Sequence, residues 1–167
     1  MDYSTVDIVA IRLSREMMEL IESGVSMVVG TRDQALRPEC MRAMGATVCP
    51  GAESLKLYLQ AQLAGRTRAN LESNGLVAVT FSRIPDHHTV QLKGKVRSIR
   101  EATAEDEAQS DRYLVAFAEQ VALAGLPRSV VRCVRTRPSL TVEVEPHEIF
   151  LQTPGAGAGR RLDRAPA

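Results

Sequence analysis

The spacing of apolar residues predicts a chain made mainly of β-strands. Residues 88–97 alternate most clearly, and the alternation divides one predicted strand into two faces. The polar face holds Thr89, Gln91, Lys93 and Lys95, and the other face holds Val90, Leu92, Gly94 and Val96. Further strands are predicted at 25–31, 39–49, 54–62, 76–81, 139–145 and 147–151. Several short strands predict an antiparallel β-barrel, because closure removes the edges that they would otherwise expose.

Four segments are predicted to be helices at the periphery of this barrel. The first has Ser14 as its N-cap and stops at Gly24, and the second spans residues 65–74. Residues 102–123 have a capping residue, an acidic first turn and an apolar face, so they form the strongest predicted helix. A short helix at 128–134 follows a proline. The predicted fold class is therefore mainly β with peripheral helices (α+β).

Composition bounds the possible functions. The 167 residues are enough for one domain with a substantial core, and their formal net charge is only +1. So small a charge provides no field for a polyanion, and no basic stripe stands out, so nucleic acid is not an expected partner. No apolar run approaches the length of a membrane span, so no membrane association is expected either.

The cysteines and the N-terminus indicate the compartment. Cys40, Cys49 and Cys133 are odd in number and lack the Cys-x-x-Cys spacing, which argues against a disulfide framework or a zinc site. Asp2 and Asp7 lie in an N-terminus without a long apolar run, so it does not resemble a signal peptide. We expect a soluble cytoplasmic protein with reduced thiols and no bound metal.

Residues 65–97 contain the most promising candidate site. Arg66 and Thr67 begin a predicted helix, where free N–H groups and the helix dipole favour anions. Thr89 and Gln91 lie on one face of the following strand, so these side chains could converge on a single phosphate group. The alternative is a solvated helix face on which the arginines bind nothing specific.

Three short motifs in this region resemble a known family. They are Gly65-Arg66-Thr67, Asn70-Leu71-Glu72-Ser73-Asn74-Gly75 and His88-Thr89-Val90-Gln91-Leu92-Lys93-Gly94. In their order and spacing they resemble the pyridoxamine 5'-phosphate oxidase-like FMN-binding split-barrel proteins. The resemblance runs from about Gly24 to Gln152.

The resemblance implies an antiparallel split β-barrel that forms a homodimer, with two FMN sites at the interface. It implies cofactor-binding roles for Arg42, Gln60, Arg66, Thr67, His88, Thr89 and Gln91. Thr67 departs from the family, in which a lysine is common at this position. Without the resemblance, Arg42 is equally well explained as an exposed edge residue, and His88 as an ordinary turn residue.

The domain boundaries follow from the same comparison. Residues 1–152 form one FMN-binding domain, with an N-terminal helix and a helical insertion at 103–134. From Thr153 a glycine-rich tail without periodicity is expected to be flexible up to residue 167. His147, beside Glu145 and Glu148, is interpreted as a surface residue rather than a catalytic base.

The expected function is that of an FMN-dependent oxidoreductase acting on a small organic molecule, with catalytic residues that the sequence does not identify. Arg161-Leu162-Asp163-Arg164-Ala165-Pro166 only approximates the Arg-Leu-x-Pro ending of the true oxidases, so pyridoxamine 5'-phosphate oxidase activity is not expected. The alternatives are a deazaflavin-coenzyme reductase of the same fold, a more distant haem-degrading enzyme, and a flavin sensor or store without catalysis.

Overall fold

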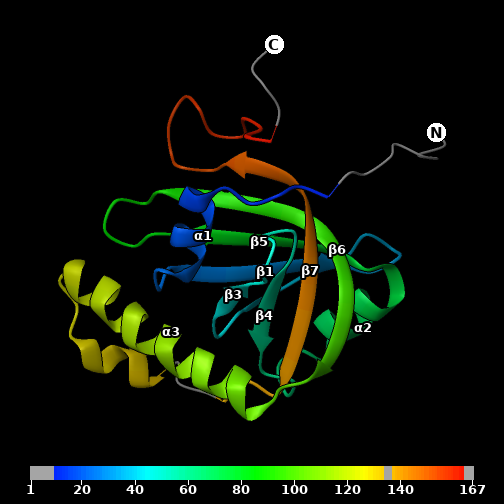
Figure 1. Cartoon of the computed structure of the whole chain (residues 1–167), viewed down its shortest axis with the longest axis horizontal. Helices are drawn as coiled ribbons and strands as arrows, with labels where there is room; N and C mark the ends of the chain where they lie inside the picture. The colour runs from blue at the N-terminus through cyan, green and yellow to red at the C-terminus, as the bar shows by residue number, and fades with distance from the viewer. Residues whose placement is uncertain (1–9, 134–136, 164–167) are drawn as a thin grey trace.

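A seven-stranded antiparallel sheet forms the centre of the computed structural model, which describes residues 10–133 and 137–163 (Figure 1). The strands lie side by side in the order β2-β1-β5-β6-β7-β4-β3. Their bounds are β1 (Ser26–Arg32), β2 (Pro38–Arg42), β3 (Ala46–Val48), β4 (Leu55–Leu59), β5 (Leu76–Ser82), β6 (Thr89–Glu101) and β7 (Leu140–Leu151). The predicted fold class, an antiparallel sheet with peripheral helices, is confirmed.

The two edge strands, β2 and β3, are neighbours in the chain and are separated only by residues 43–45. The predicted single strand 39–49 is therefore wrong: the chain leaves β1 after Arg42 and pairs with β4 instead. Gly45 makes this transfer with φ 130°, and a Cβ there would lie 3.1 Å from Tyr113 and 3.2 Å from Tyr58. Because one short link joins both edges, the sheet curls toward closure but stays split.

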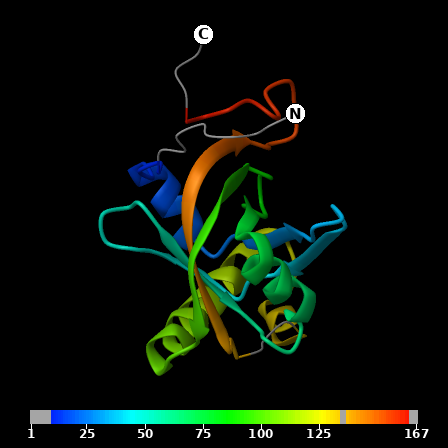
Figure 2. The same ribbon diagram turned by 90° about the vertical axis from the view of Figure 1, so that its right-hand side faces the viewer.

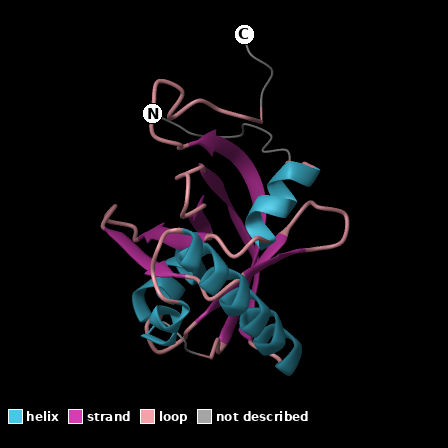
Figure 3. Cartoon of the chain, turned by 90° about the vertical axis from the view of Figure 1, so that its left-hand side faces the viewer, coloured by secondary structure: helices cyan, strands magenta, loops and turns pink. Residues whose placement is uncertain are grey.

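The helices lie around this sheet (Figure 3). They are α1 (Arg15–Glu22), α2 (Gly65–Asn74), α3 (Ala104–Leu123) and the 3-10 helix η1 (Arg128–Cys133). α2 packs against β1, β2 and β5, and the buried Asn70 donates from Nδ2 to Thr31 Oγ1 at 3.0 Å. Val134, the last residue of the predicted 128–134 helix, lies outside the described residues.

β6 and β7 form a long curved pair (Figure 2). β7 is one strand where two were predicted, at 139–145 and 147–151, because Pro146 stays within it. Gly94 pairs with Pro146 while Lys93 pairs with Glu148, which leaves His147 as an extra residue in a β-bulge. A proline is tolerated at such an irregularity because it lacks the N–H that a regular ladder needs.

The tail that begins at Thr153 is described by the structure over residues 153–163. It folds back along β7, with Gly159 N donating to Leu151 O at 2.7 Å and Leu162 N donating to Ile149 O at 2.8 Å. The Asp163 carboxylate also accepts a hydrogen bond from Ile149 N at 3.0 Å. Residues 164–167, with the rest of the Arg-Leu-x-Pro-like ending, lie outside the described residues, as do residues 1–9 with Asp2 and Asp7.

None of the described helices is long and apolar enough to cross a membrane. In residues 10–133 and 137–163, no three His, Cys, Asp or Glu side chains are placed to hold a metal ion. Cys40, Cys49 and Cys133 are free thiols.

Candidate functional site

The start of α2 presents unsatisfied hydrogen-bond donors. Its N-cap residue, Ala64, has no side chain that could accept a hydrogen bond. Within the described part of the chain, no acceptor faces the backbone N–H groups of Gly65, Arg66 or Thr67. Thr67 is only 1% exposed, and its Oγ1 has no hydrogen-bond partner. A buried hydroxyl without a partner carries a desolvation cost, so this helix start is suited to accepting an anion.

Arg66 and Arg42 do not converge on one anion. Arg66 is 84% exposed and forms an ion pair with Glu39 of β2 at 2.8 Å. The Arg42 guanidinium lies 5.2 Å from the centroid of the Phe117 ring and donates to Ser26 Oγ at 3.4 Å. Glu39 and Arg42 are three residues apart on β2, so their side chains point to opposite faces of the strand. The two arginines therefore lie on different sides of the sheet edge.

Gln60 lies close to the start of α2, in the short connection that follows β4. It is half-buried, and its carbonyl accepts a hydrogen bond from Leu63 N at 3.0 Å. Gln60, Arg66 and Thr67 are thus the three predicted site residues that the fold gathers at one helix end.

Thr89 and Gln91 lie on one face of β6, as the alternation predicted, while Val90 and Leu92 are buried on the other. Gln91 Nε2 donates to Thr80 Oγ1 at 3.2 Å, and Thr80 in turn is opposite Val28 on β1. Val28 is 39% exposed on this face. The next cross-strand row contains Gly30 and Ala78, followed by Lys93, so at the two small residues the face is flat enough for a planar ring.

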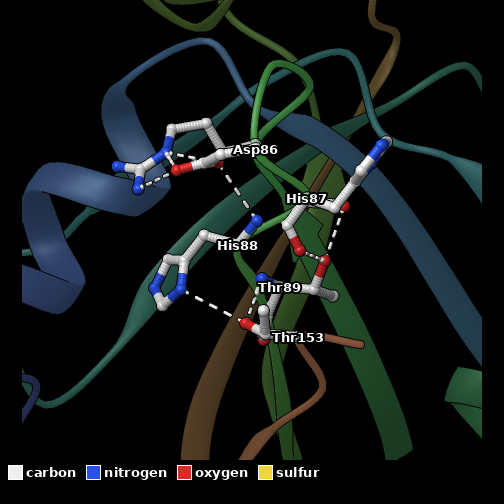
Figure 4. A network of polar contacts seen from close by, with 7 residues as sticks. Asp86, His87, His88, Thr89 and Thr153 are labelled. Carbon is white, nitrogen blue, oxygen red and sulfur yellow. Dashed lines mark hydrogen bonds and ion pairs between the residues drawn. The ribbon is translucent and has the colours of Figure 1, made fainter. Parts of the chain in front are cut away.

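The hairpin between β5 and β6 contains His88 and Thr89, and Figure 4 shows their contacts. Thr89 Oγ1 bonds to Ser82 Oγ at 2.7 Å and to the His87 carbonyl at 2.8 Å. His88 Nδ1 lies 3.2 Å from Thr153 Oγ1, which ties the hairpin to the tail (Figure 4). The Thr89 hydroxyl therefore forms hydrogen bonds within the turn, and the His88 ring contacts the tail. These residues precede Gln91 by two and three positions along the chain.

A groove of about 1250 Å³ lies beside these residues, yet none of the seven predicted site residues lines it. Strands β1, β2, β5, β6 and β7 contribute to it, together with Ile11 and the tail residues Arg161 and Asp163. Lys93, Lys95 and His147 are its titratable side chains from β6 and the β7 bulge. The sequence analysis did not assign a site to these residues.

His147 is held in this groove by the carboxylate of Glu145. Its side chain is 9% exposed, and Nε2 lies 2.8 Å from Glu145 Oε1. Arg97 donates from Nε to the other carboxylate oxygen, Oε2, at 2.6 Å. The hydrogen bonds from His147 and Arg97 hold the pKa of Glu145 below its usual range, so Glu145 is an ionised acceptor. The expectation that His147 is a plain surface residue is therefore wrong.

Arg161 connects the tail to the same groove. It forms ion pairs with Glu148 at 2.6 Å and with Asp163 at 2.5 Å, and its guanidinium lies 5.6 Å from the Phe150 ring centroid. Burial raises the pKa of Asp163, but the hydrogen bonds from Arg161 and Ile149 outweigh it and lower that pKa. Two carboxylates thus compensate the one charge of Arg161.

The sequence matches the model of the family described as Pyridoxamine 5'-phosphate oxidase over residues 13–151. None of the curated proteins matches it. Among solved structures it is similar to HupZ from Group A Streptococcus, at 19% identity and a TM-score of 0.56, over 88% of this chain and 99% of that chain. It is also similar to General Stress Protein 26 from Bacillus anthracis, at 14% identity and a TM-score of 0.52, over 92% of this chain and 100% of that chain.

A third similar structure is an F420 reductase, at 14% identity and a TM-score of 0.52, over 82% of this chain and 98% of that chain. At these identities the likeness concerns the fold alone. It agrees with the split β-barrel that the sequence predicted.

Proposed function

The chain belongs to the pyridoxamine 5'-phosphate oxidase family, and from that membership we propose that it is an FMN-binding flavoprotein. We further propose that it is an oxidoreductase acting on a small organic substrate, and that this substrate is not pyridoxamine 5'-phosphate. The flavin, when bound, would supply hydride or electron transfer, and the protein's part is to hold and surround it.

The observation that supports the proposal is the start of α2. Three free backbone N–H groups, the unpartnered Thr67 hydroxyl and the Arg66 guanidinium lie within the first turn of one helix. A phosphate monoester provides acceptor oxygens for all of them, together with a negative charge that the helix dipole favours. In this proposal Arg66 exchanges its exposed ion pair with Glu39 for the phosphate, and Gln60 lies at the edge of the same site.

Gln91 and the flat row beside it share a sheet face with Val28 and Arg42, opposite to the face of Glu39, so in the proposed dimer they would hold the ring of a flavin whose phosphate binds at the start of α2 in the other copy. The amide oxygen of Gln91 can accept a hydrogen bond while its Nε2 donates to Thr80. Gly30 and Ala78 in the neighbouring cross-strand row have no bulky side chain, so a planar ring can approach the sheet there. Arg42, His88 and Thr89 remain proposed members of the cofactor shell on the family resemblance.

An absorption spectrum of the purified protein tests the cofactor. We expect the bands of oxidised flavin, and phosphate-containing flavin released by denaturation. A deazaflavin or haem spectrum in their place would contradict the FMN assignment. Turnover of pyridoxamine 5'-phosphate at an ordinary enzymatic rate would contradict the proposal that this molecule is not the substrate. Bound flavin that reduced nicotinamide cannot reduce would favour a flavin sensor or storage protein.

Arg66→Ala is expected to weaken FMN binding by about ten- to a hundredfold, because one charge-assisted contact with the phosphate is lost. Riboflavin lacks the phosphate, so its affinity should change much less. Flavin fluorescence titrations of both ligands measure the two effects. Arg68→Ala is the matched control, since Arg68 is two residues further along α2 and already pairs with Glu72 at 2.7 Å. Equal losses for FMN and riboflavin would show that Arg66 does not contact the phosphate.

We also propose that two copies associate through the sheet face that carries Val28, Thr80 and Gln91. An exposed valine beside Gly30 and Ala78 provides the flat apolar centre that a protein interface needs.

Wild type is expected to sediment at twice the 18.2 kDa chain mass. Val28→Lys should give a folded monomer, because an ammonium group would be buried at the interface beside the like charge of Arg42, its cross-strand neighbour. Val115→Lys is the control: Val115 is 68% exposed on α3, and this variant should remain dimeric. A wild-type monomer at micromolar concentration with flavin bound would exclude the dimer.

A further inference from the structure

Glu39 of β2 lies beside the start of α2, although it is not one of the seven proposed flavin contacts. Its carboxylate forms an ion pair with Arg66 Nη2 at 2.8 Å. The Glu39 side chain is 22% exposed, whereas the Arg66 side chain is 84% exposed. The carboxylate is therefore the fixed member of this pair, and the guanidinium is the mobile one that reaches toward it.

The packing of α2 on β1 and β2 keeps Glu39 in this place. Glu39 is opposite Thr31 in the sheet, so the two side chains lie on one face, and α2 packs on that face. Asn70 Nδ2 donates to Thr31 Oγ1 at 3.0 Å, and Arg66 lies four residues before Asn70 in the same helix. Residues four apart share one face of a helix, so two cross-strand neighbours contact two helical neighbours. This paired contact fixes the carboxylate within reach of the first turn of α2.

The protein thus places its own anion beside a helix start that is suited to an anion. Among residues 10–133 and 137–163, Arg66 is the one cation that pairs with Glu39. Thr67 Oγ1 still has no hydrogen-bond partner, so the carboxylate engages the guanidinium without filling the site. A phosphate that fills the site must draw Arg66 away from Glu39 and then lies near an uncompensated carboxylate. Both effects lower the affinity for the phosphate.

We propose that Glu39 competes with the ligand phosphate for Arg66, and that this competition lowers the affinity of the site and keeps the bound flavin exchangeable. The inference rests on the proposed function, because it concerns the phosphate site at the start of α2. Arg66 pairs with Glu39 when the site is empty and with phosphate oxygens when it is filled. When the ligand leaves, Glu39 takes the guanidinium back. Glu39 therefore acts through Arg66 and does not contact the flavin itself.

Glu39→Gln removes the charge and keeps the size of the side chain, so it should tighten FMN binding. The expected gain is about fivefold, which corresponds to about 1 kcal/mol, the upper value for an exposed ion pair. Riboflavin has no phosphate, so its affinity should not change. Flavin fluorescence titrations at one ionic strength measure both ligands. Glu72→Gln is the matched control, because it removes the same charge from the Arg68–Glu72 pair of α2 and should leave the FMN affinity unchanged.

A double-mutant cycle separates competition from simple charge repulsion. In an Arg66→Ala background Glu39 has no guanidinium to hold, so Glu39→Gln should tighten FMN less than it does in wild type. Inorganic phosphate is a second probe that requires no flavin. Glu39→Gln should lower the phosphate concentration that half-shifts the amide resonances of Gly65, Arg66 and Thr67 in an NMR titration.

An FMN affinity that Glu39→Gln leaves unchanged or weakens would overturn this inference and leave the proposed function standing. A weaker affinity would mean that Glu39 orients Arg66 toward the phosphate instead of competing for it. An equal gain for riboflavin would also overturn the inference, because riboflavin brings no phosphate to the site. A protein that binds no flavin, but whose Glu39→Gln variant binds inorganic phosphate more tightly, would refute the proposed function and leave this inference standing.

Discussion

Asp106→Asn is expected to lower the free energy of unfolding by about 3 kcal/mol, the scale on which breaking a buried ion pair destabilises a protein. Asp106 is 3% exposed near the start of α3. It accepts hydrogen bonds from both terminal nitrogens of Arg100, from Thr103 N and Oγ1, and from Thr141 Oγ1. An amide cannot replace a carboxylate here, because its NH₂ group would face donors and the charge of Arg100 would lose its partner.

The pH dependence of unfolding gives a second measurement of the same network. Burial raises the pKa of Asp106, but the bonds from Arg100, Thr103 and Thr141 outweigh it and hold the pKa well below its usual range. A carboxyl group with a lowered pKa stabilises the fold fully above its unfolded value near 4, and this stabilisation is lost as the pH falls toward the folded value. The difference between wild type and Asp106→Asn should therefore be constant from pH 5 to 7 and shrink below pH 4.

Asp86→Asn is the control for this prediction. The pKa of Asp86 is also well below its usual range, chiefly through the side-chain hydrogen bond from Arg83, yet the Asp86 side chain is 52% exposed. Exposed ion pairs contribute little because solvent screens them, so this variant should unfold almost as wild type does. Urea denaturation at several pH values measures both variants. A loss for Asp106→Asn no larger than that for Asp86→Asn would show that the buried network adds no stability.

The helix ends could be predicted because their signals lie within a few residues of one another. Ser14 Oγ accepts from Met17 N at 3.2 Å, and Gly75 ends α2 in the left-handed conformation with φ 68°. Thr103 and Asp106 form the capping box that begins α3. Each of these contacts is decided by local residue types, so no knowledge of the tertiary fold is needed.

The strand break at 43–45 could not be predicted because it depends on distant partners. The apolar pattern of 39–49 continues through it, while Ala43 N bonds to Met27 O and Met44 N bonds to Tyr58 O. The burial of Tyr58 has the same origin. Tyr58 alternates with Leu57 and Leu59 and so shares a face of β4 with the polar Lys56, yet it is 1% exposed, with its hydroxyl bonded to Thr47 at 2.8 Å.

The same difference between local and long-range contacts explains which parts of the candidate site could be predicted. The electropositive start of α2 is local and was predicted, whereas the groove requires β6, β7, Ile11 and the tail to meet. His147 looked like a surface residue because the sequence showed only its acidic neighbours. The available signal was Gly94, a glycine inside a strand pattern, which often marks a bulge or the close approach of another backbone.

Gly94→Ala is expected to destabilise the fold by about 3 kcal/mol, the upper part of the range for overpacking, because the obstacle is backbone. A Cβ at this position would lie 2.1 Å from the Glu145 carbonyl oxygen and 2.9 Å from its carbon. To make room, β7 must move away from β6 at the bulge, and the Glu145–His147 pair must move with it.

Gly30→Ala is the matched control, since its Cβ would meet only the Ala78 carbonyl oxygen at 3.7 Å, an ordinary contact. Chemical denaturation measures the stability of both variants, and the His147 ring resonances report the geometry of the bulge. Gly94→Ala should lower the unfolding midpoint and shift those resonances, and Gly30→Ala should do neither. Equal stability of the two variants would mean that the close approach of β7 to Gly94 does not hold the bulge in place.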